Sequence, residues 1–464
     1  MVFQSINPAT EEILDEFNEH EPDKVERALT ASERTFRSWR TISFRQRGEL
    51  LRAVAKELRG DKQTFAGLIT AEMGKPIVEA EAELEKCAWN CDYFADHAEE
   101  FLTNLKRDSS ASESYVAFEP LGTILAIMPW NFPFWQVFRF AAPTLMAGNT
   151  AVLKHASNVP QCALAIERVF QQAGAPDALF QTLLLSSERI GSLIDDDRIR
   201  AVTLTGSDVA GSQVAERSGK ALKKTVLELG GSDPFIVLPD ADLDRTVTMA
   251  VNARYQNTGQ SCIAAKRFIV VDEAAGEFVP RFVAAVDELR TGDPVERDTK
   301  IGPLARDDLR SGVHNQVERS LALEAGLATG GQSLERKGYF YTPTVLTNVR
   351  PGMPAFDEEV FGPVAAVVPA RDVSAAIELA NRSHYGLGAS IWTRDIQQAQ
   401  TLAGQIEAGS VFINGIVASD PRLPFGGVKR SGYGRELSEF GIHEFVNIKT
   451  VWIGPPRDER PRGE

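Results

Sequence analysis

The chain contains few cysteines and few histidines. Its 464 residues include 4 cysteines and 6 histidines. So few cysteines in so long a chain exclude a disulfide framework. The histidines are scattered and form no His-Glu-x-x-His motif, which argues against zinc-dependent hydrolysis, and we expect no metal site. Cys87 and Cys91 share one face of a helical segment, and we expect them to pack in the core.

Long apolar runs and an excess of positive charge are also missing. The most apolar run, Leu121 to Trp135, is broken by glycine and proline and is too short to cross a bilayer. The first residues show no basic segment followed by an apolar one, so we expect no signal peptide. Lys and Arg number 50 against 64 Asp and Glu, a net charge of −14, which argues against nucleic-acid binding. We therefore expect a cytoplasmic protein that binds neither membranes nor nucleic acids.

What is present is the composition of a globular protein, with 43% apolar and 25% charged residues. A chain of this length exceeds one ordinary hydrophobic core, so we expect two or three domains. Apolar residues at three- and four-residue spacing predict helices over the first hundred residues, at 22–37, 44–59 and 77–102.

Short apolar segments alternate with helical ones along the rest of the chain. Predicted strands lie at 122–128, 150–153, 181–185, 201–205 and 225–229, with helices at 160–173 and 209–218. A second block has strands at 234–238, 267–271, 362–368 and 409–414 and helices at 274–289, 309–324 and 374–380. Strands separated by helices of this length predict right-handed crossovers and parallel sheets. The fold class is therefore α/β, with ligands at the carboxyl ends of the strands.

The last apolar segment, residues 446–453, predicts one more strand. It has no obvious partner in the sequence, and exposed strand edges in native proteins are usually covered. We therefore expect an oligomer.

Cys262 ends the small, polar segment Asn257-Thr258-Gly259-Gln260-Ser261-Cys262. A thiol in such a turn can stay exposed and reactive. Most lone cysteines are instead buried as small hydrophobic residues, so the choice depends on which other groups accompany this one.

Two polar residues are candidates to act with this thiol. Glu228 ends an apolar strand just before Gly230. It is either a polar residue at a strand end or a base whose pKa burial raises toward the working pH. Asn131 is either a turn residue or an amide donor to a developing oxyanion.

Two segments favour phosphate binding. Residues 205–211 follow a strand and open a helix, which offers free backbone amides and a positive dipole end. They do not form a Gly-x-Gly-x-x-Gly motif, and an ordinary capped helix is the alternative. Lys154 ends another strand, where it can reach a ribose or phosphate or be simply an exposed lysine. Ser157 replaces the carboxylate common in NAD-selective sites and leaves room for a 2′-phosphate.

These segments together resemble the aldehyde dehydrogenase superfamily over essentially the whole chain. The matching pieces are Pro129-Trp130-Asn131-Phe132-Pro133, Lys154, Gly206 to Gly211, Leu227-Glu228-Leu229-Gly230-Gly231, Gly259-Gln260-Ser261-Cys262, Glu359-Val360-Phe361-Gly362-Pro363 and Pro424-Phe425-Gly426-Gly427. The resemblance implies a Rossmann-like parallel-sheet cofactor domain (1–105 and 121–230) and a second α/β catalytic domain (231–430). It also implies a small β oligomerisation element (106–120 and 440–456) and a homodimer or homotetramer.

The same resemblance implies the roles of individual residues. Cys262 becomes the nucleophile, Glu228 the base, and Asn131 with the Cys262 amide the oxyanion hole. The reaction it implies oxidises an aldehyde through a Cys262 thioester, which water activated by Glu228 hydrolyses to a carboxylic acid. The implied cofactor contacts come from Trp130, Lys154, Ser157, Gly206, Ser207, Leu229, Glu359 and Phe361. Either NADP or NAD fits this set, and the neutral residue at position 157 favours NADP.

Within the superfamily, the chain looks most like the compact succinate-semialdehyde dehydrogenases, which implies succinate semialdehyde as the substrate. The substrate-binding residues implied are Arg139, Phe132, Ser419 and Phe425.

Two positions depart from relatives of this kind. A second carboxylate-binding arginine of some members is Gln256 here, and the nearby Arg254 is expected to point elsewhere. Lactaldehyde, glycolaldehyde and glutarate semialdehyde therefore remain alternatives, with a non-catalytic structural protein as a remote one. Ala264 replaces a cysteine that forms a redox disulfide with the nucleophile in some relatives, so we expect that switch to be absent.

Overall fold

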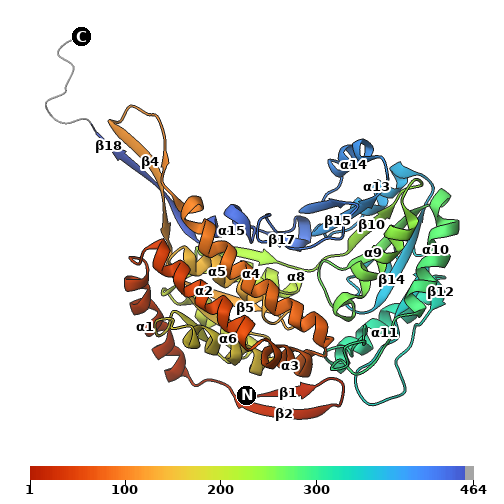
Figure 1. The fold of residues 1–464 in the computed structure, drawn as a ribbon, viewed down its shortest axis with the longest axis horizontal. Coiled ribbons are helices and arrows are strands. Elements are labelled where there is room, and N and C mark those ends of the chain that lie inside the picture. The colour runs from red at the N-terminus through yellow and green to blue at the C-terminus, as the bar shows by residue number, and fades with distance from the viewer. Residues whose placement is uncertain (455–464) are drawn as a thin grey trace, which may run out of the picture.

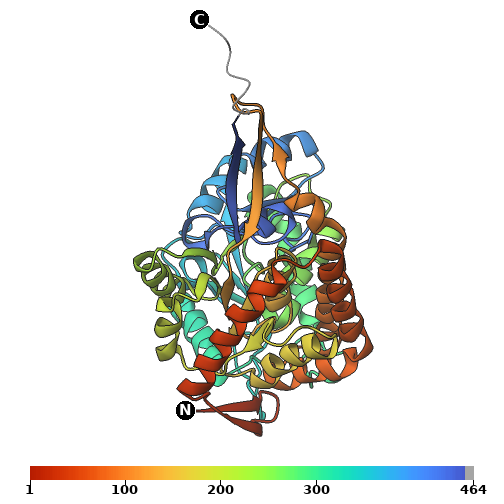
Figure 2. The ribbon, with the colours of Figure 1, turned by 90° about the vertical axis from the view of Figure 1, so that its left-hand side faces the viewer.

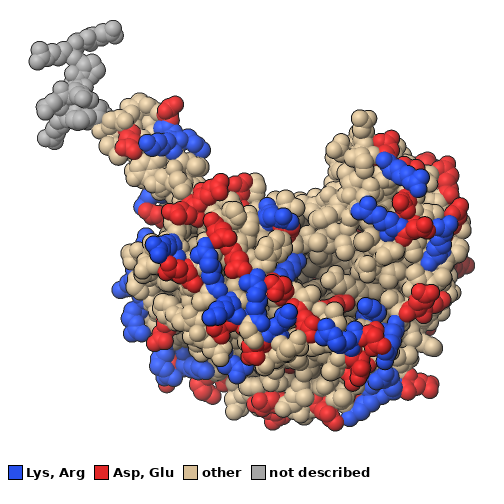
Figure 3. All heavy atoms as spheres, in the orientation of Figure 1, with Lys and Arg blue, Asp and Glu red and all other residues tan. Residues whose placement is uncertain are grey.

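A computed structural model of the protein describes residues 1–454. Its strands form sheets of two, seven, six and three strands, and helices cover the two larger sheets (Figures 1 and 2). The α/β class is confirmed. No helix in this described part is long and apolar enough to cross a membrane. The face in Figure 3 carries acidic and basic side chains interspersed, without the extended basic area that nucleic-acid binding needs.

The six-stranded sheet has the strand order β17-β9-β8-β5-β6-β7. The chain runs outward from β5 to β7, then returns to the other side of β5 to add β8 and β9, so the strand order reverses at β5. The strands are β5 (Thr123–Met128), β6 (Thr150–His155), β7 (Phe180–Thr182), β8 (Ile199–Thr205), β9 (Lys224–Glu228) and the antiparallel β17 (Gly432–Tyr433). Such a reversal opens a crevice at the carboxyl ends of the strands, where ligands bind.

Helices cover both faces of this sheet because its strands are apolar on both sides. Ile124 and Ala126 of β5 join one core cluster, and Leu125 between them joins another. The helices of the first face are α2 (Phe44–Gly60), α3 (Lys62–Met73), α4 (Ile77–Leu102), α5 (Trp135–Met146) and α6 (Pro160–Gln172). Those of the second face are α1 (Pro22–Trp39), α7 (Ile190–Asp195) and α8 (Asp208–Lys220).

The seven-stranded sheet is parallel except at one edge, where β12 runs antiparallel to β13. In spatial order its strands are β12 (Gly326–Thr329), β13 (Thr344–Thr347), β14 (Val364–Ala370), β11 (Ala265–Val271), β10 (Asp233–Val237), β15 (Gly388–Trp392) and β16 (Ser410–Ile413). One face carries α9 (Leu243–Tyr255) and α10 (Asp272–Asp287). The other face carries α11 (Asp307–Leu321), α12 (Pro354–Asp357), α13 (Val373–Asn381) and α14 (Ile396–Ala403).

The last strand, β18 (Val446–Ile453), has a partner within the chain. It pairs antiparallel with β4 (Glu113–Pro120), which also pairs with β3 (Leu105–Lys106). These strands form an arm that projects from the body (Figures 1 and 2). The arm follows the short helix α15 (Ser438–His443), and its outer strand exposes Ile448 and Trp452. Residues 455–456 of the expected oligomerisation segment lie outside the described residues.

Several elements differ from the sequence expectation. Residues predicted as purely helical include a hairpin of β1 (Val2–Asn7) and β2 (Glu12–Asn18), and α3 was not predicted. The hairpin was missed because β2 is almost wholly exposed and its apolar residues Ile13, Leu14 and Phe17 do not alternate with polar ones, so it lacks the pattern that marks a half-buried strand. The strand predicted at 181–185 ends at Thr182, and β15 was also missed.

Candidate active site

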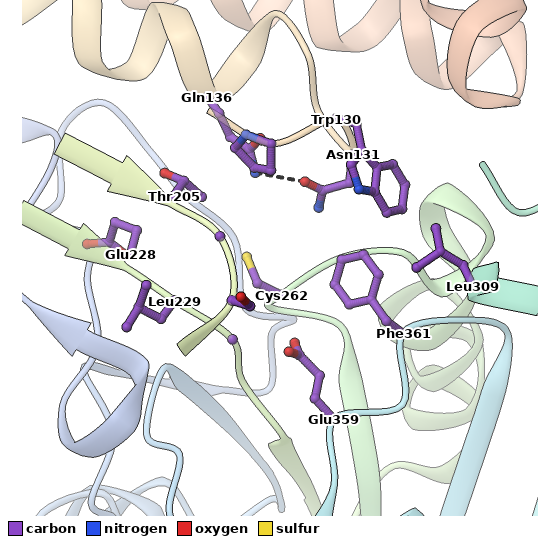
Figure 4. Close-up of a pocket in the computed structure, with 14 residues that line it drawn as sticks. Trp130, Asn131, Gln136, Thr205, Glu228, Leu229, Cys262, Leu309, Glu359 and Phe361 are labelled. Carbon is purple, nitrogen blue, oxygen red and sulfur yellow. Dashed lines mark hydrogen bonds between the residues drawn. The ribbon is translucent and has the colours of Figure 1, made fainter. Parts of the chain in front are cut away.

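One cavity lies where the carboxyl ends of β8 and β9 face the loop that carries Cys262 (Figure 4). Its volume is about 200 Å³. It brings together the three expected catalytic residues and six of the eight expected cofactor residues. Its lining is Pro129, Trp130, Asn131, Gln136, Thr205, Gly206, Ser207, Glu228, Leu229, Gly230, Cys262, Leu309, Glu359 and Phe361.

The loop before Cys262 is strained. Asn257 and Thr258 have φ of 56° and 55°, in the left-handed region, and Gly259 follows at 73°. A left-handed conformation costs a residue other than glycine on the order of 1–2 kcal/mol. Hydrogen bonds hold the loop: Glu79 accepts from the Asn257 amide at 2.6 Å, and Asn257 Nδ2 donates to the Asn131 carbonyl at 2.8 Å. These hydrogen bonds offset the strain and hold the nucleophile loop against the segment that carries Asn131.

Arg254 holds the other side of this loop. Its guanidinium is buried and donates to the carbonyls of Gly259 at 2.9 Å and Val360 at 3.1 Å. It thereby joins the nucleophile loop to the segment of Glu359. Arg254 does not line the catalytic cavity, and Gln256 lines a separate cavity with Glu79.

The Asn131 side chain is oriented by two hydrogen bonds. Its Oδ1 accepts from Gln136 Nε2 at 3.1 Å (Figure 4), and its Nδ2 donates to the Gln260 carbonyl at 3.0 Å. An amide nitrogen carries two hydrogens, so one remains for an oxygen bound in the cavity. Gln136 was missed from the sequence because nothing local marks it as a partner of Asn131.

Glu228 is buried at the end of β9. Neither carboxyl oxygen has a hydrogen-bond partner within residues 1–454. Burial raises the pKa of Glu228 well above its ordinary value, the nearby Glu436 raises it further, and Arg139 opposes both. A Cβ on Gly426 would lie 2.7 Å from Glu228 Oε1, so only glycine leaves that oxygen room. Because its pKa is raised, the ionised carboxylate of Glu228 is a stronger base than an ordinary glutamate and is suited to take a proton from water.

Lys266 binds the backbone of the nucleophile loop. Its Nζ donates to the carbonyls of Ser261 at 2.8 Å and Cys262 at 2.6 Å and lies 3.5 Å from Glu359 Oε1. Burial raises the pKa of the Cys262 thiol to about 11, and the charge of Lys266 acts against this rise. Lys266 was missed, although a lysine inside the apolar strand β11 is a visible signal.

The raised pKa of Cys262 predicts a steep pH dependence of its alkylation. Below pH 11 the thiolate fraction rises about tenfold per pH unit, and the thiolate is the reactive form. We expect the second-order rate of inactivation of the resting enzyme by iodoacetamide to rise about tenfold per unit between pH 7 and 10. Peptide mass spectrometry should place the label on Cys262, since Cys87, Cys91 and Cys162 are buried. A rate that levels off below pH 8 would contradict the raised pKa.

The substrate residues expected from the sequence do not line this cavity. Arg139 was expected to be free for a carboxylate, but it is buried and ion-paired with Glu436. It also donates to Thr205 Oγ1 at 3.3 Å and lies over the ring of Phe425 at 4.6 Å. The sequence could not show this pairing because Glu436 lies in a distant segment.

Phe132 and Ser419 contact lysines outside the cavity. Lys75 Nζ lies 3.8 Å from the centre of the Phe132 ring. Ser419 Oγ accepts from Lys86 Nζ at 2.8 Å. Cys87 and Cys91 are buried in the core as predicted.

The residues around the cavity fit nicotinamide adenine dinucleotide phosphate (NADP). Ser207 caps α8 by accepting from the Ala210 amide at 3.2 Å, which leaves the positive helix end facing the cavity side of the sheet. A Cβ on Gly211 would lie 2.6 Å from Leu229, so the glycine lets α8 approach β9 closely. Lys154 lies one residue before the end of β6, and burial lowers its pKa. Lys154 and Ser157 lie outside the cavity. No cluster of the described residues could hold a metal ion.

The chain is similar to known proteins over nearly its whole length. Residues 1–451 match the model of the aldehyde dehydrogenase family. A probable succinate-semialdehyde dehydrogenase [NADP(+)] of Synechocystis is 53% identical over 98% of this chain and 100% of its own. A succinate semialdehyde dehydrogenase [NAD(P)+] of Escherichia coli is 51% identical over 97% of both chains. The crystal structure of succinic semialdehyde dehydrogenase from Streptococcus pyogenes in complex with NADP+ matches with a TM-score of 0.96 and 38% identity, over 98% of this chain and 100% of that one. The chain belongs to the aldehyde dehydrogenase family.

Proposed function

We propose that the protein oxidises succinate semialdehyde to succinate, with NADP+ as the electron acceptor. The observation that carries the proposal is the single cavity shared by Cys262, Glu228 and Asn131. The full-length similarity to dehydrogenases named for this substrate supports its identity.

In the first half of the reaction the Cys262 thiolate adds to the aldehyde carbon. The second N–H of Asn131 and the backbone amide of Cys262 donate to the oxyanion that forms. When bound, NADP+ supplies the acceptor for the hydride that leaves this carbon. The negative charge is stabilised most while the carbon is tetrahedral, so these donors lower the barrier more than they strengthen substrate binding.

In the second half, water hydrolyses the thioester on Cys262. Glu228 takes a proton from this water, which then attacks the thioester carbon. The C–S bond breaks, the acid leaves, and the sulfur is again a thiolate. The high pKa of Glu228 makes its carboxylate a strong enough base for this step.

In this proposal each expected domain has its own role. Residues 1–105 and 121–230 hold the cofactor, with Lys154 and Ser157 near its 2′-phosphate, and residues 231–430 carry the nucleophile. The segments 106–120 and 440–456 pair with a second subunit, in a homodimer or homotetramer. The exposed apolar residues of β18 support such pairing. The catalytic thiol must stay reduced, which favours the cytoplasm.

A panel of aldehydes with both cofactors tests this function. We expect kcat/KM for succinate semialdehyde with NADP+ to exceed the values for lactaldehyde, glycolaldehyde and butanal by at least about 30-fold. That ratio corresponds to about 2 kcal/mol, the free energy of one charge-assisted hydrogen bond to the distal carboxylate. Succinate semialdehyde with NAD+ should be the poorer combination. Absorbance of the reduced nicotinamide measures every rate. Equal kcat/KM for butanal and succinate semialdehyde would contradict the substrate assignment, and a strong preference for NAD+ would contradict the cofactor assignment.

A further inference from the structure

Lys266 on β11 connects the nucleophile loop to Glu359 through three oxygen atoms. Its Nζ donates to the Ser261 carbonyl at 2.8 Å and to the Cys262 carbonyl at 2.6 Å, and it faces Glu359 Oε1 at 3.5 Å. An ammonium group carries three N–H donors, so these three oxygens occupy all of them. The lysine side chain is only 1% exposed, which keeps bulk water from competing. The ammonium group is therefore held in one orientation.

The bond to the Ser261 carbonyl also orients the backbone amide of Cys262. This carbonyl and this amide belong to one peptide unit, which is planar and trans. In a trans peptide the carbonyl and the N–H point in opposite directions, so the Cys262 N–H points away from Lys266. The same N–H has no acceptor within residues 1–454, and Cys262 lines the catalytic cavity. The amide is thus free to donate to an oxygen bound there.

The bond to the Cys262 carbonyl fixes the peptide unit that follows. Both peptide planes that flank Cys262 are now tied to one ammonium group, which leaves the φ and ψ of this residue little freedom. The direction of the Cα–Cβ bond, and with it the position of the sulfur, follows from these two angles. Lys266 therefore sets the relative position of the sulfur and the amide of the nucleophile.

The charge of Lys266 strengthens the amide as a donor. A hydrogen bond from a cation is about twice as strong as a neutral one, and bonded groups polarise one another. The ammonium group draws electron density from the Ser261 carbonyl and thereby makes the Cys262 N–H of the same peptide more acidic. The Ala264 amide also donates to this carbonyl, at 3.2 Å, but carries no charge.

We infer that Lys266 is a positioning residue that orients the Cys262 amide toward the oxyanion and strengthens it as a donor. The inference rests on the proposed function only in that the reaction uses this amide. The alternative role of Lys266 is to neutralise two buried carboxyl groups near it, those of Glu359 and Asp233. The two roles differ in their effect on reactions that form an oxyanion and on reactions that form none.

Lys266→Met tests the inference by comparing two reactions of the same thiol. Aldehyde oxidation passes through an oxyanion, whereas alkylation by iodoacetamide displaces iodide and forms none. We expect kcat/KM for succinate semialdehyde at saturating NADP+, divided by the alkylation rate constant, to fall about 10- to 100-fold. Removing an oxyanion donor outright costs about 10²- to 10³-fold, and here the donor stays but loses its orientation. The loss should appear in kcat with KM little changed.

The alkylation rate by itself measures the effect of the charge on the thiol. Burial raises the pKa of Cys262, and Lys266 opposes that rise. Removing Lys266 should therefore raise this pKa further and slow alkylation between pH 7 and 10. Both reactions start from the thiolate, so this loss cancels in the ratio. Lys266→Arg keeps the charge and the N–H donors, and it should restore the alkylation rate and most of the ratio.

Arg267→Lys on the same strand serves as the matched control. Arg267 also donates to buried backbone carbonyls, those of Ser232, Leu379 and Ala380, none of them in the nucleophile loop. This variant should lower the unfolding temperature and keep the wild-type ratio. Lys266→Gln, which keeps an amide donor, is the milder second variant where Lys266→Met does not fold. Its ratio should also fall.

The possible results separate the inference from the proposed function. Equal losses of oxidation and alkylation in the folded Lys266 variants would show that the lysine acts only through its charge, and would overturn the inference. Butanal forms the same oxyanion, so its ratio should fall as far. A fall limited to succinate semialdehyde would place Lys266 in substrate recognition and overturn the inference too. Wild-type enzyme without a preference for succinate semialdehyde would contradict the proposed substrate and leave the inference standing.

Discussion

Replacement of Cys262 by alanine is expected to lower kcat by at least about 10⁴-fold, because no thioester can form without the sulfur. The Cys262 loop is held by Glu79, Arg254 and Lys266 through groups other than the thiol. The variant should therefore fold and keep its thermal unfolding temperature. Reduced-nicotinamide absorbance with succinate semialdehyde measures the loss.

A buried cysteine provides the matched control for this prediction. Cys91→Ala on α4 removes the same atom from the core, at a residue that does not line the cavity. We expect it to lower stability by about 1 kcal/mol and to keep catalysis. Turnover retained in Cys262→Ala would show that another group is the nucleophile, or that the chain does not use covalent catalysis.

Replacement of Glu228 by glutamine is expected to separate the two halves of the reaction. Glutamine fills the same buried space but cannot take a proton from water. Thioester formation should continue, so rapid mixing should show a burst of about one reduced nicotinamide per site. The steady rate should then fall by about 10²- to 10⁴-fold, the usual contribution of a general base. Mass spectrometry should find the acyl group on Cys262.

The pH dependence of the steady rate provides a further check on Glu228. A base acts only when ionised, and burial raises the pKa of this one. Where hydrolysis limits the rate, wild-type turnover should rise with pH through that raised pKa, and the residual turnover of the variant should not. Glu49→Gln, at an exposed site on α2, is the matched control. A variant without a burst would place Glu228 before the thioester rather than after it.

The sheet strands and the long amphipathic helices could be predicted because their signal is local. The apolar segment Thr123–Met128 is buried on both sides, and α4 repeats its buried residues at helical spacing. The hairpin Val2–Asn18 shows no clear apolar repeat, because β2 is almost wholly exposed and only Phe3 and Ser5 of β1 are buried. It could not be predicted from periodicity.

The catalytic residues could be proposed from sequence because each lies in a distinctive segment at a strand end or turn. The residues that position these catalytic residues could not be proposed from sequence. Gln136 contacts Asn131 after the chain has entered α5, and Lys266 reaches the nucleophile loop from inside β11. These contacts depend on side-chain direction, which the helix and strand geometry sets only after the elements have packed.

The sequence by itself determined the α/β class, the family and many of the strands and helices of the two larger sheets, and it proposed Cys262, Asn131 and Glu228 as nucleophile, amide donor and base. Hydrophobic periodicity and short motifs are properties of neighbouring residues, so they can be recognised in the sequence without a structure. Only the tertiary structure decided which charges are paired. Glu436 reaches Arg139, and Lys86 meets Ser419 across 333 positions of sequence. Electrostatic pairing depends on distance and burial in space, and this is why the partner of Arg139 could not be predicted from the sequence.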